Sequence, residues 1–310
     1  MSALICGSLA YDTIMVFPGR FKEHILPEKV HILNVSFMVP QIRREFGGCA
    51  GNIAYNLHLL GGEGQIMATA GQDFEPYAEW IVQCGLSQRY IKKIGHEYTA
   101  QAFVTTDLDD NQITAFHSGA MNNSHENDVP RDGDISIAII SPDGKEGMLQ
   151  HAQQCHDAGI PFIFDPGQGM PMFNGDELLS FIEQASYICV NDYESELLQE
   201  RTGLGIQKIA EQVEAMIVTY GSKGSAIHAE GSRIEIPAVW AGSVQDPTGC
   251  GDAYRGGLLF GLMNDLDWEV SGRIASLISA IKVAHPGTQN HSITPDEFRE
   301  RYEQEFGHAF

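Results

Sequence analysis

The sequence predicts an α/β fold, with a mostly parallel sheet covered by helices on both faces and a small second sheet projecting from it. Short apolar runs of strand length recur, and several lack polar alternation, as expected of parallel strands buried on both faces. These runs lie at residues 3–8, 135–141, 160–165, 187–191 and 215–220. Helical patterns alternate with them or follow them, at 50–61, 147–159, 193–203, 251–284 and 295–305. This alternation predicts the parallel strand order.

Two segments lack a helical crossover and predict the second sheet. Residues 12–46 contain the strand-like runs DTIMVF and VHILNVSFMV, and residues 98–117 have the pattern of a hairpin that turns near Asp109–Asn111. We expect a small antiparallel sheet, formed by about 12–46 and 98–118 and inserted in a single domain of residues 1–310. Such a sheet can act as a lid that excludes water from a reaction.

Composition excludes several classes of protein. The net charge of −22 argues against binding to duplex nucleic acid, which needs clustered Lys and Arg, but it permits a nucleotide held by backbone N–H groups. No apolar run reaches the ~20 residues of a membrane span, and no basic segment precedes the first apolar stretch. The six cysteines form no C-x-x-C pair and the histidines form no H-x-x-x-H pair. We therefore expect a cytoplasmic protein with reduced thiols and neither a zinc site nor a membrane partner.

Common nucleotide and nucleophile motifs are missing from the sequence. There is no Walker A sequence, no Rossmann G-x-G-x-x-G after the first strand and no G-x-S-x-G elbow. Any nucleotide chemistry must therefore depend on other segments.

The stretch DPTGCGDAYRGG begins at Asp246 and passes from a glycine-rich turn into a predicted helix. The small side chains of Gly249, Cys250 and Gly251 let their N–H groups converge on one anion, whose growing negative charge they would stabilise in a transition state. Asp252, the next residue, could accept a proton from an attacking hydroxyl. The alternative is ordinary helix capping by Asp252.

Two further stretches follow buried strands. In NDYE, Asn191 and Glu194 could hold Mg²⁺, directly or through water, and Asn191 could also contact ATP; a capping box explains the same spacing. In VTYGSKGS, the backbone of Thr219, Gly221 and Gly224 could lie beside a nucleotide. The alternative for this second stretch is a simple hairpin turn.

The stretch FGGCAGNIA contains a glycine pair directly before a helix. Gly47 and Gly48 suggest a hinge or a close approach of backbone to ligand. Asn52 lies inside the helix, where Asn has poor propensity, so its side chain should face a hydrogen-bonding partner such as a sugar hydroxyl.

Two aromatic residues of the predicted hairpin raise the question of a base-bearing substrate. Phe103 and Phe116 are equidistant from the middle of the turn, so in a tight register they would be cross-strand neighbours on one face. Such a pair stabilises a sheet. On a lid above a sugar site, an aromatic ring could also stack on a base.

Four of these stretches, in the order in which the chain carries them, resemble motifs of the ribokinase-like sugar and nucleoside kinases, the phosphofructokinase-B family. They are FGGCAGNIA, NDYE, VTYGSKGS and DPTGCGD. The resemblance covers essentially the whole chain and implies a three-layer αβα sandwich with a mostly parallel central sheet. The chain departs from the family at Cys250, where alanine is usual, but the backbone N–H is unchanged. Within the family the sequence is most similar to bacterial adenosine kinases.

That resemblance implies roles for individual residues. Asp12, Gly48 and Asn52 would hold ribose hydroxyls and Phe116 would stack on the purine, while other residues line the pocket or lie near the base: Ser8, Ser36 and Gln168. Relatives carry a second glutamine where this chain has Gly169, and an arginine where it has Met172.

The implied reaction is attack of a nucleoside 5′-hydroxyl on the γ-phosphate of magnesium-ATP, with adenosine as the expected acceptor. Closure of the lid near Gly47–Gly48 would exclude water, and Asp246 and Thr248 would ligate a monovalent cation such as K⁺. Strand edges in the lid could pair two subunits as a homodimer. The alternatives are another acceptor (ribose, another sugar, inosine or guanosine) or a relative that binds metabolites without catalysis.

Overall fold

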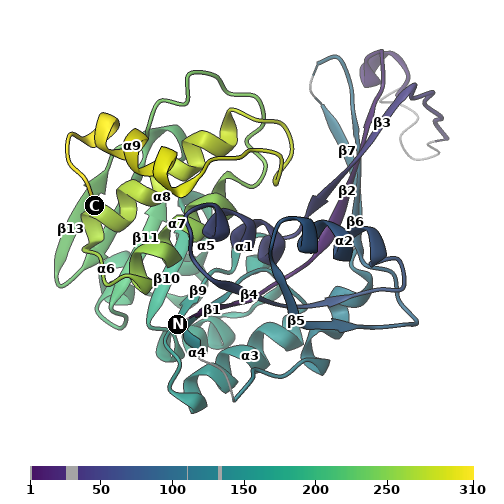
Figure 1. The fold of residues 1–310 in the computed structure, drawn as a ribbon. Coiled ribbons are helices and arrows are strands. Elements are labelled where there is room, and N and C mark those ends of the chain that lie inside the picture. Colours follow the sequence, from purple (N-terminus) through teal and green to yellow (C-terminus); the bar gives the residue numbers. More distant parts are fainter. Residues whose placement is uncertain (1, 26–33, 110, 132–134) are drawn as a thin grey trace.

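A nine-stranded sheet forms the centre of the computed structural model, which describes residues 2–25, 34–109, 111–131 and 135–310 (Figure 1). The strand order is β13-β12-β11-β10-β9-β8-β1-β4-β5, with parallel pairing from β5 to β11 and antiparallel pairing at β12 and β13. The strands are β1 Ser2–Cys6, β4 Gly64–Ala70, β5 Ser87–Lys93, β8 Ile135–Ile140, β9 Phe162–Phe164, β10 Tyr187–Asn191, β11 Ala215–Thr219, β12 Ser225–Ala229 and β13 Ser232–Ile236. The predicted mostly parallel sheet is confirmed.

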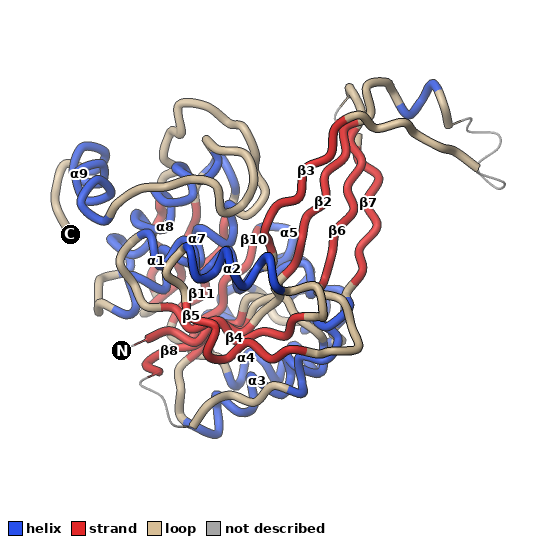
Figure 2. Tube along the Cα trace, turned by 45° about the vertical axis from the view of Figure 1, so that its right-hand side comes forward, coloured by secondary structure: helices blue, strands red, loops and turns tan. Residues whose placement is uncertain are grey.

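Helices cover both faces of this sheet, as Figure 2 also shows. Successive side chains of a strand point to opposite faces of the sheet and belong to two separate hydrophobic cores; Ile5, for example, packs in one core and Leu4 in the other. The first core is completed by α1 Cys49–Leu59, α2 Glu75–Gln83, α7 Cys250–Met263, α8 Trp268–Val283 and α9 Pro295–Phe306. The second is completed by α3 Lys145–Ala158, α4 Gly175–Gln184, α5 Asp192–Thr202 and α6 Ile206–Ala210. None of these helices is long and apolar enough to cross a membrane.

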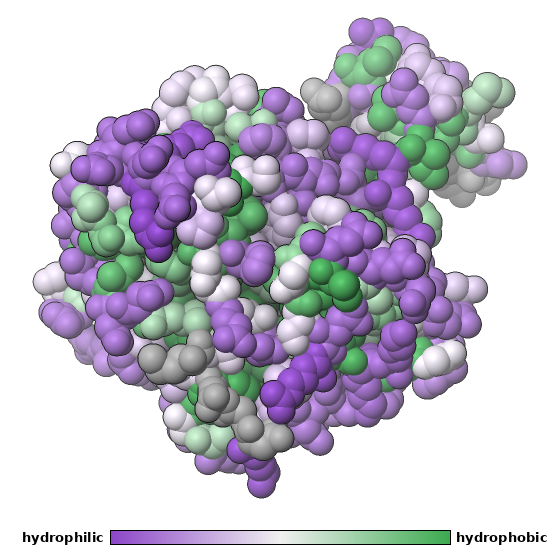
Figure 3. Space-filling view, in the orientation of Figure 1, coloured by the Kyte–Doolittle hydropathy of each residue, from purple (hydrophilic) through white to green (hydrophobic). Residues whose placement is uncertain are grey.

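A separate four-stranded sheet, which we call the lid, projects from this body (Figures 1 and 2). Its order is β3-β2-β6-β7, from β2 Ala10–Val16, β3 Gln41–Gly47, β6 Ala100–Thr106 and β7 Gln112–His117. The lid was expected to be antiparallel, but β2 and β6 pair in parallel. Figure 3 shows the lid standing clear of the body, with hydrophobic side chains exposed among hydrophilic ones.

One lid strand lies later in the sequence than predicted. The run VHILNVSFMV covers 30–39, of which 30–33 fall outside the described residues and 34–39 form no strand; the strand is β3 instead. Hydrophobicity misleads here because most of β3 is exposed or half-buried, so its sequence is polar. The apolar Phe37 packs against Phe17 and Phe21, with ring centroids 4.8 and 5.0 Å away.

The predicted pairing of Phe103 with Phe116 is wrong by one residue. Phe103 lies opposite Ala115, and Phe116 lies opposite Ala102. The cause is the loop 107–111, where the Asp107 carboxylate accepts the N–H groups of residues 109 and 111 and centres the turn on residue 109. Because successive side chains alternate between faces, Phe103 and Phe116 lie on opposite faces of the lid.

Candidate active site

The first turn of α7 lies beside the base of the lid and provides backbone donors. Gly249 adopts a left-handed conformation, with φ of +75°, immediately before the helix. The first N–H groups of a helix have no acceptor within it, so those of Gly251 and Asp252 are directed beyond the helix start. The N–H of Cys250, by contrast, donates to Pro247 O at 3.2 Å, so one of the three predicted donors closes a turn.

Asp252 is half-buried at this helix start and is held by Asn52 of α1. The Asn52 side-chain amide donates to Asp252 Oδ2 at 2.7 Å. The two helices approach closely at Gly256, where an added Cβ would lie 2.9 Å from the Cβ of Asn56. Burial raises the pKa of Asp252 to about 6, and the Asn52 hydrogen bond opposes that shift. A carboxylate with this pKa is ionised at neutral pH and is suited to accept a proton.

A hydrogen-bond network fixes the orientation of the Asn52 amide. Gln289 donates to Asn52 Oδ1 at 2.9 Å and to the Tyr77 hydroxyl at 2.8 Å, while Trp80 donates to Gln289 Oε1 at 2.8 Å. The Tyr77 hydroxyl donates to Gly47 O at 2.7 Å. The oxygen of Asn52 is therefore occupied by a donor, which leaves its NH₂ group to face the carboxylate.

Asp12 and the pair Gly47–Gly48, which were predicted to bind the acceptor, lie close to Asp252. An added Cβ on Gly47 would lie 2.6 Å from Asp12 Oδ2, and one on Gly48, whose φ is +88°, would lie 2.5 Å from Ser8 O. Burial raises the pKa of Asp12 to about 6, and the charge of Asp252 contributes to the shift. Only glycine fits at position 48, where the Cβ would meet backbone, whereas a side chain at position 47 would displace the Asp12 carboxylate. The carboxylates of Asp12 and Asp252 share one electrostatic environment.

A pocket of about 480 Å³ extends from the first turn of α7 to the predicted nucleotide segment. Thr219, Gly221 and Gly224 line it together with Cys250 and Gly251. Its remaining walls are largely apolar and include side chains that sequence reasoning missed: Ala238, Val239, Trp240, Val244, Ala280 and Val283. A pocket with an apolar wall and a polar turn can accept a flat base at one end and phosphates at the other.

The pair Asn191 and Glu194 forms the capping box that was the structural alternative. Glu194 N–H donates to Asn191 Oδ1 at 2.7 Å, and both Glu194 carboxylate oxygens accept from Asn191 at 2.8 Å. Both side chains are thus already hydrogen-bonded, which fits contact with Mg²⁺ through water better than direct ligation. Within the described ranges, no cluster of three His, Cys, Asp or Glu side chains is placed to hold a metal.

A buried ion pair beneath α7 was not predicted from the sequence. Arg255 donates to Asp165 at 2.9 Å, its side chain lies 3.9 Å from Glu194, and it reaches Gly251 O at 3.3 Å. The exposed fractions of the Arg255 and Asp165 side chains are 6% and 3%. Arg255 also donates to Cys189 O at 3.3 Å, so it connects the first turn of α7 to Asp165 and to β10.

The remaining predicted ligands lie in the lid or at its margin. Phe116 shares a lid face with Asp12, because both occupy the row that contains Ala102. Phe103 lies on the other face, so the geometry does not place it with the acceptor residues. Ser36 is exposed in the segment before β3, and Gln168 is exposed in the short 3₁₀ helix Gly167–Met172.

Comparison with known proteins shows the family of this chain. The family model of the pfkB carbohydrate kinases matches residues 9–295. The chain belongs to the pfkB family of carbohydrate kinases. It is thus a phosphotransferase with an alcohol group as acceptor, and its fold is ribokinase-like, as the sequence predicted.

Relatives of this kinase include a curated nucleoside kinase of Methanocaldococcus jannaschii, 33% identical over 89% of this chain and 92% of that protein. Among solved structures, the nucleoside kinase of Burkholderia thailandensis in complex with inosine is 51% identical, covers 99% of both chains and has a TM-score of 0.90. The complex of that enzyme with ADP-inosine is 52% identical, with a TM-score of 0.88, and covers 99% of this chain and 97% of that one.

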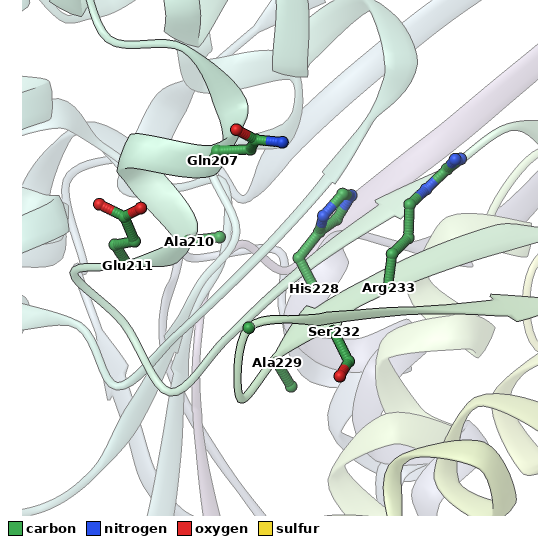
Figure 4. Close-up of a pocket in the computed structure, with 8 residues that line it drawn as sticks. Gln207, Ala210, Glu211, His228, Ala229, Ser232 and Arg233 are labelled. Carbon is green, nitrogen blue, oxygen red and sulfur yellow. The ribbon is translucent and has the colours of Figure 1, made fainter.

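A second pocket of this kinase, of about 380 Å³, lies away from the site (Figure 4). It is formed by α6 and the β12–β13 hairpin, and Gln207, His228 and Arg233 line it. It contains none of the residues predicted for catalysis or nucleotide binding.

Proposed function

We propose that this kinase transfers the γ-phosphate of ATP to the 5′-hydroxyl of a purine ribonucleoside. The observation that carries this proposal is the half-buried Asp252 carboxylate, oriented by Asn52 at the helix start that borders the 480 Å³ pocket. The inosine complex of the relative at 51% identity supports inosine as an acceptor. Adenosine remains our prediction from sequence.

In this proposal Asp252 removes the proton of the attacking hydroxyl. The N–H groups of Gly251 and Asp252 hold the phosphoryl group as charge develops on its oxygens, because a helix start favours anions. Thr219, Gly221 and Gly224 contact the nucleotide through the pocket wall. Phosphoryl transfer requires an oriented nucleophile and stabilisation of the charge on the phosphoryl oxygens, and this arrangement would supply both.

The acceptor would lie between Asp252 and the lid. Asp12, Gly48 and Asn52 hold the ribose hydroxyls, with Ser8 beneath them, and Phe116 stacks on the base from the lid face that also carries Asp12. Ser36 and Gln168 complete the pocket when the lid closes. An acceptor without a base would make no use of Phe116.

Magnesium enters this proposal as the ion bound to ATP. Asn191 and Glu194 would hold it through water, since their side chains are engaged with each other. When bound, the ion neutralises charge on the phosphates. Dimerisation through the lid also remains a prediction, supported by exposed apolar side chains such as Ile42 and Ile113.

The test is a panel of acceptors in a coupled assay for ADP. Adenosine, inosine, guanosine and ribose are compared at matched concentrations with magnesium-ATP. The proposal predicts that kcat/KM for at least one purine nucleoside exceeds that for ribose by about tenfold or more, which corresponds to roughly 1.4 kcal/mol from base stacking. Preference for ribose would favour a sugar kinase, and binding without ADP formation would favour a non-catalytic relative.

A further inference from the structure

Lys282 lies wholly buried in the last turn of α8, directly behind the anion-binding turn. Its ammonium group donates to the main-chain carbonyl of Asp246 at 2.6 Å and lies 3.5 Å from that of His285. A buried ammonium must be surrounded by oxygens, because an unpaired charge in the interior is costly. Main-chain carbonyl oxygens are also the ligands that a bound K⁺ would use.

The two segments that contribute these carbonyls are held together around the ammonium. Gln245 and Asp246 N–H groups donate to Val283 O at 2.9 and 3.2 Å, and Gly287 N–H donates to Asp246 Oδ2 at 2.9 Å. The other oxygen of the Asp246 carboxylate accepts the Thr248 N–H at 2.9 Å. Both oxygens of Asp246 thus have donors, and its carbonyl faces Lys282.

This arrangement does not fit a bound monovalent cation at Asp246 and Thr248. A cation bound to the Asp246 carbonyl would share that oxygen with the Lys282 ammonium, which lies 2.6 Å from it. The two like charges would then lie within roughly 5 Å of each other and repel in a site of low dielectric. The two cations therefore compete for this carbonyl oxygen.

We propose that the ammonium of Lys282 takes the place of the monovalent cation, so that this kinase carries its own cation and does not depend on K⁺. Lys282 is a positioning residue: it holds the Asp246 carbonyl, and with it the segment that leads into Gly249 and the helix start. The inference about rate rests on the proposed kinase function. The inference about ion binding does not.

The first test measures the initial rate of the unmodified enzyme while KCl replaces tetramethylammonium chloride at constant ionic strength, from none to about 100 mM. We expect the rate to change by less than about twofold. A saturable activation of about fivefold or more would overturn the proposal.

The second test uses Lys282→Ala, which removes the ammonium group and leaves a space in its place. In Lys282→Ala we expect kcat to fall by about tenfold or more and to recover with K⁺ or NH₄⁺ but not with tetramethylammonium. Lys208→Ala, which removes an exposed lysine, is the matched control and should respond to none of these ions. A folded Lys282→Ala enzyme that no small cation rescues would contradict the proposal.

Thermal unfolding gives a readout that needs no activity. K⁺ should raise the Tm of Lys282→Ala and leave that of the unmodified protein unchanged relative to tetramethylammonium, because only the variant has room for the ion. If no acceptor yields ADP, the kinase proposal fails while this measurement still decides the cation proposal. If the variant does not fold, the salt titration of the unmodified enzyme decides it.

Discussion

Replacing Asp252 by Asn removes the proposed general base but keeps its size and its contact with Asn52, whose NH₂ group can donate to the new amide oxygen as it does to Asp252 Oδ2 at 2.7 Å. General-base catalysis contributes about 10²- to 10⁴-fold, so kcat should fall by that factor, or about 3–5 kcal/mol in activation free energy. Affinity for ATP should change little, because the carboxylate faces Asn52 and the acceptor residues.

The same substitution should stabilise the fold at neutral pH. The pKa of Asp252 rises from 3.8 to about 6 on folding, so the folded state retains a proton that the unfolded chain has lost. The free energy of unfolding therefore falls as pH rises between these two pKa values. Above about pH 6 the ionised carboxylate lowers it by no more than about 3 kcal/mol. Asp252→Asn avoids this cost and should have the higher unfolding free energy at about pH 7.

Three assays check this reasoning: ADP formation for kcat, calorimetry for ATP binding, and urea unfolding at about pH 4 and about pH 7. The unmodified enzyme should also lose kcat/KM on the acid side, with an apparent pKa near 6. At about pH 5, kcat/KM should be roughly a tenth of its value at neutral pH, because protonation of a single carboxylate lowers its ionised fraction by about that factor. Near-normal turnover in Asp252→Asn, or a loss of ATP affinity equal to the loss of turnover, would refute the assignment.

Further predictions concern the buried ion pair of Arg255, the backbone conformation at Gly48 and the stacking of Phe116 on a base. Arg255→Met leaves its buried carboxylate partner unpaired and should lower the unfolding free energy by about 3–5 kcal/mol; a change below about 1 kcal/mol in urea unfolding would contradict this. Gly48→Ala should lower Tm by several degrees more than Gly203→Ala, since both have positive φ but only the first Cβ meets backbone; equal effects would exclude a role for close approach. Phe116→Ala should reduce kcat/KM for nucleosides but not for ribose, while Phe103→Ala, on the opposite face, spares both; equal losses in the two variants would argue against stacking.

The body of the fold could be predicted because its signals are local. The runs at 187–191 and 215–220 coincide with β10 and, to within a residue, β11, as their unbroken hydrophobicity predicted for buried parallel strands. The lid was harder, since its strands lie largely exposed and are not marked by hydrophobicity. β3 therefore appeared in the wrong place, and the Asp107 turn displaced the register of Phe103 by one residue.

The candidate site also contains residues that the sequence could predict and residues that it could not. Asp252, Asn52 and the glycine pair each lie in a short motif whose residue types point to a ligand, and the structure brings these residues together. Asp165 and Arg255 gave no such signal, because each is ordinary in its own stretch and the pair joins residues 90 positions apart. Lys282 was missed for the same reason: a lysine at a helix end predicts solvent exposure, and only the fold places the Asp246 carbonyl against it.

The most direct test of the central claim is a structure of the ternary complex with a purine nucleoside and a non-hydrolysable ATP analogue. We expect the terminal phosphorus within about 4 Å of the N–H groups of Gly251 and Asp252, and the nucleoside 5′-hydroxyl within hydrogen-bonding distance of the Asp252 carboxylate, about 2.6–3.2 Å. A terminal phosphate bound away from this helix start, or a carboxylate that faces no acceptor hydroxyl, would contradict the account.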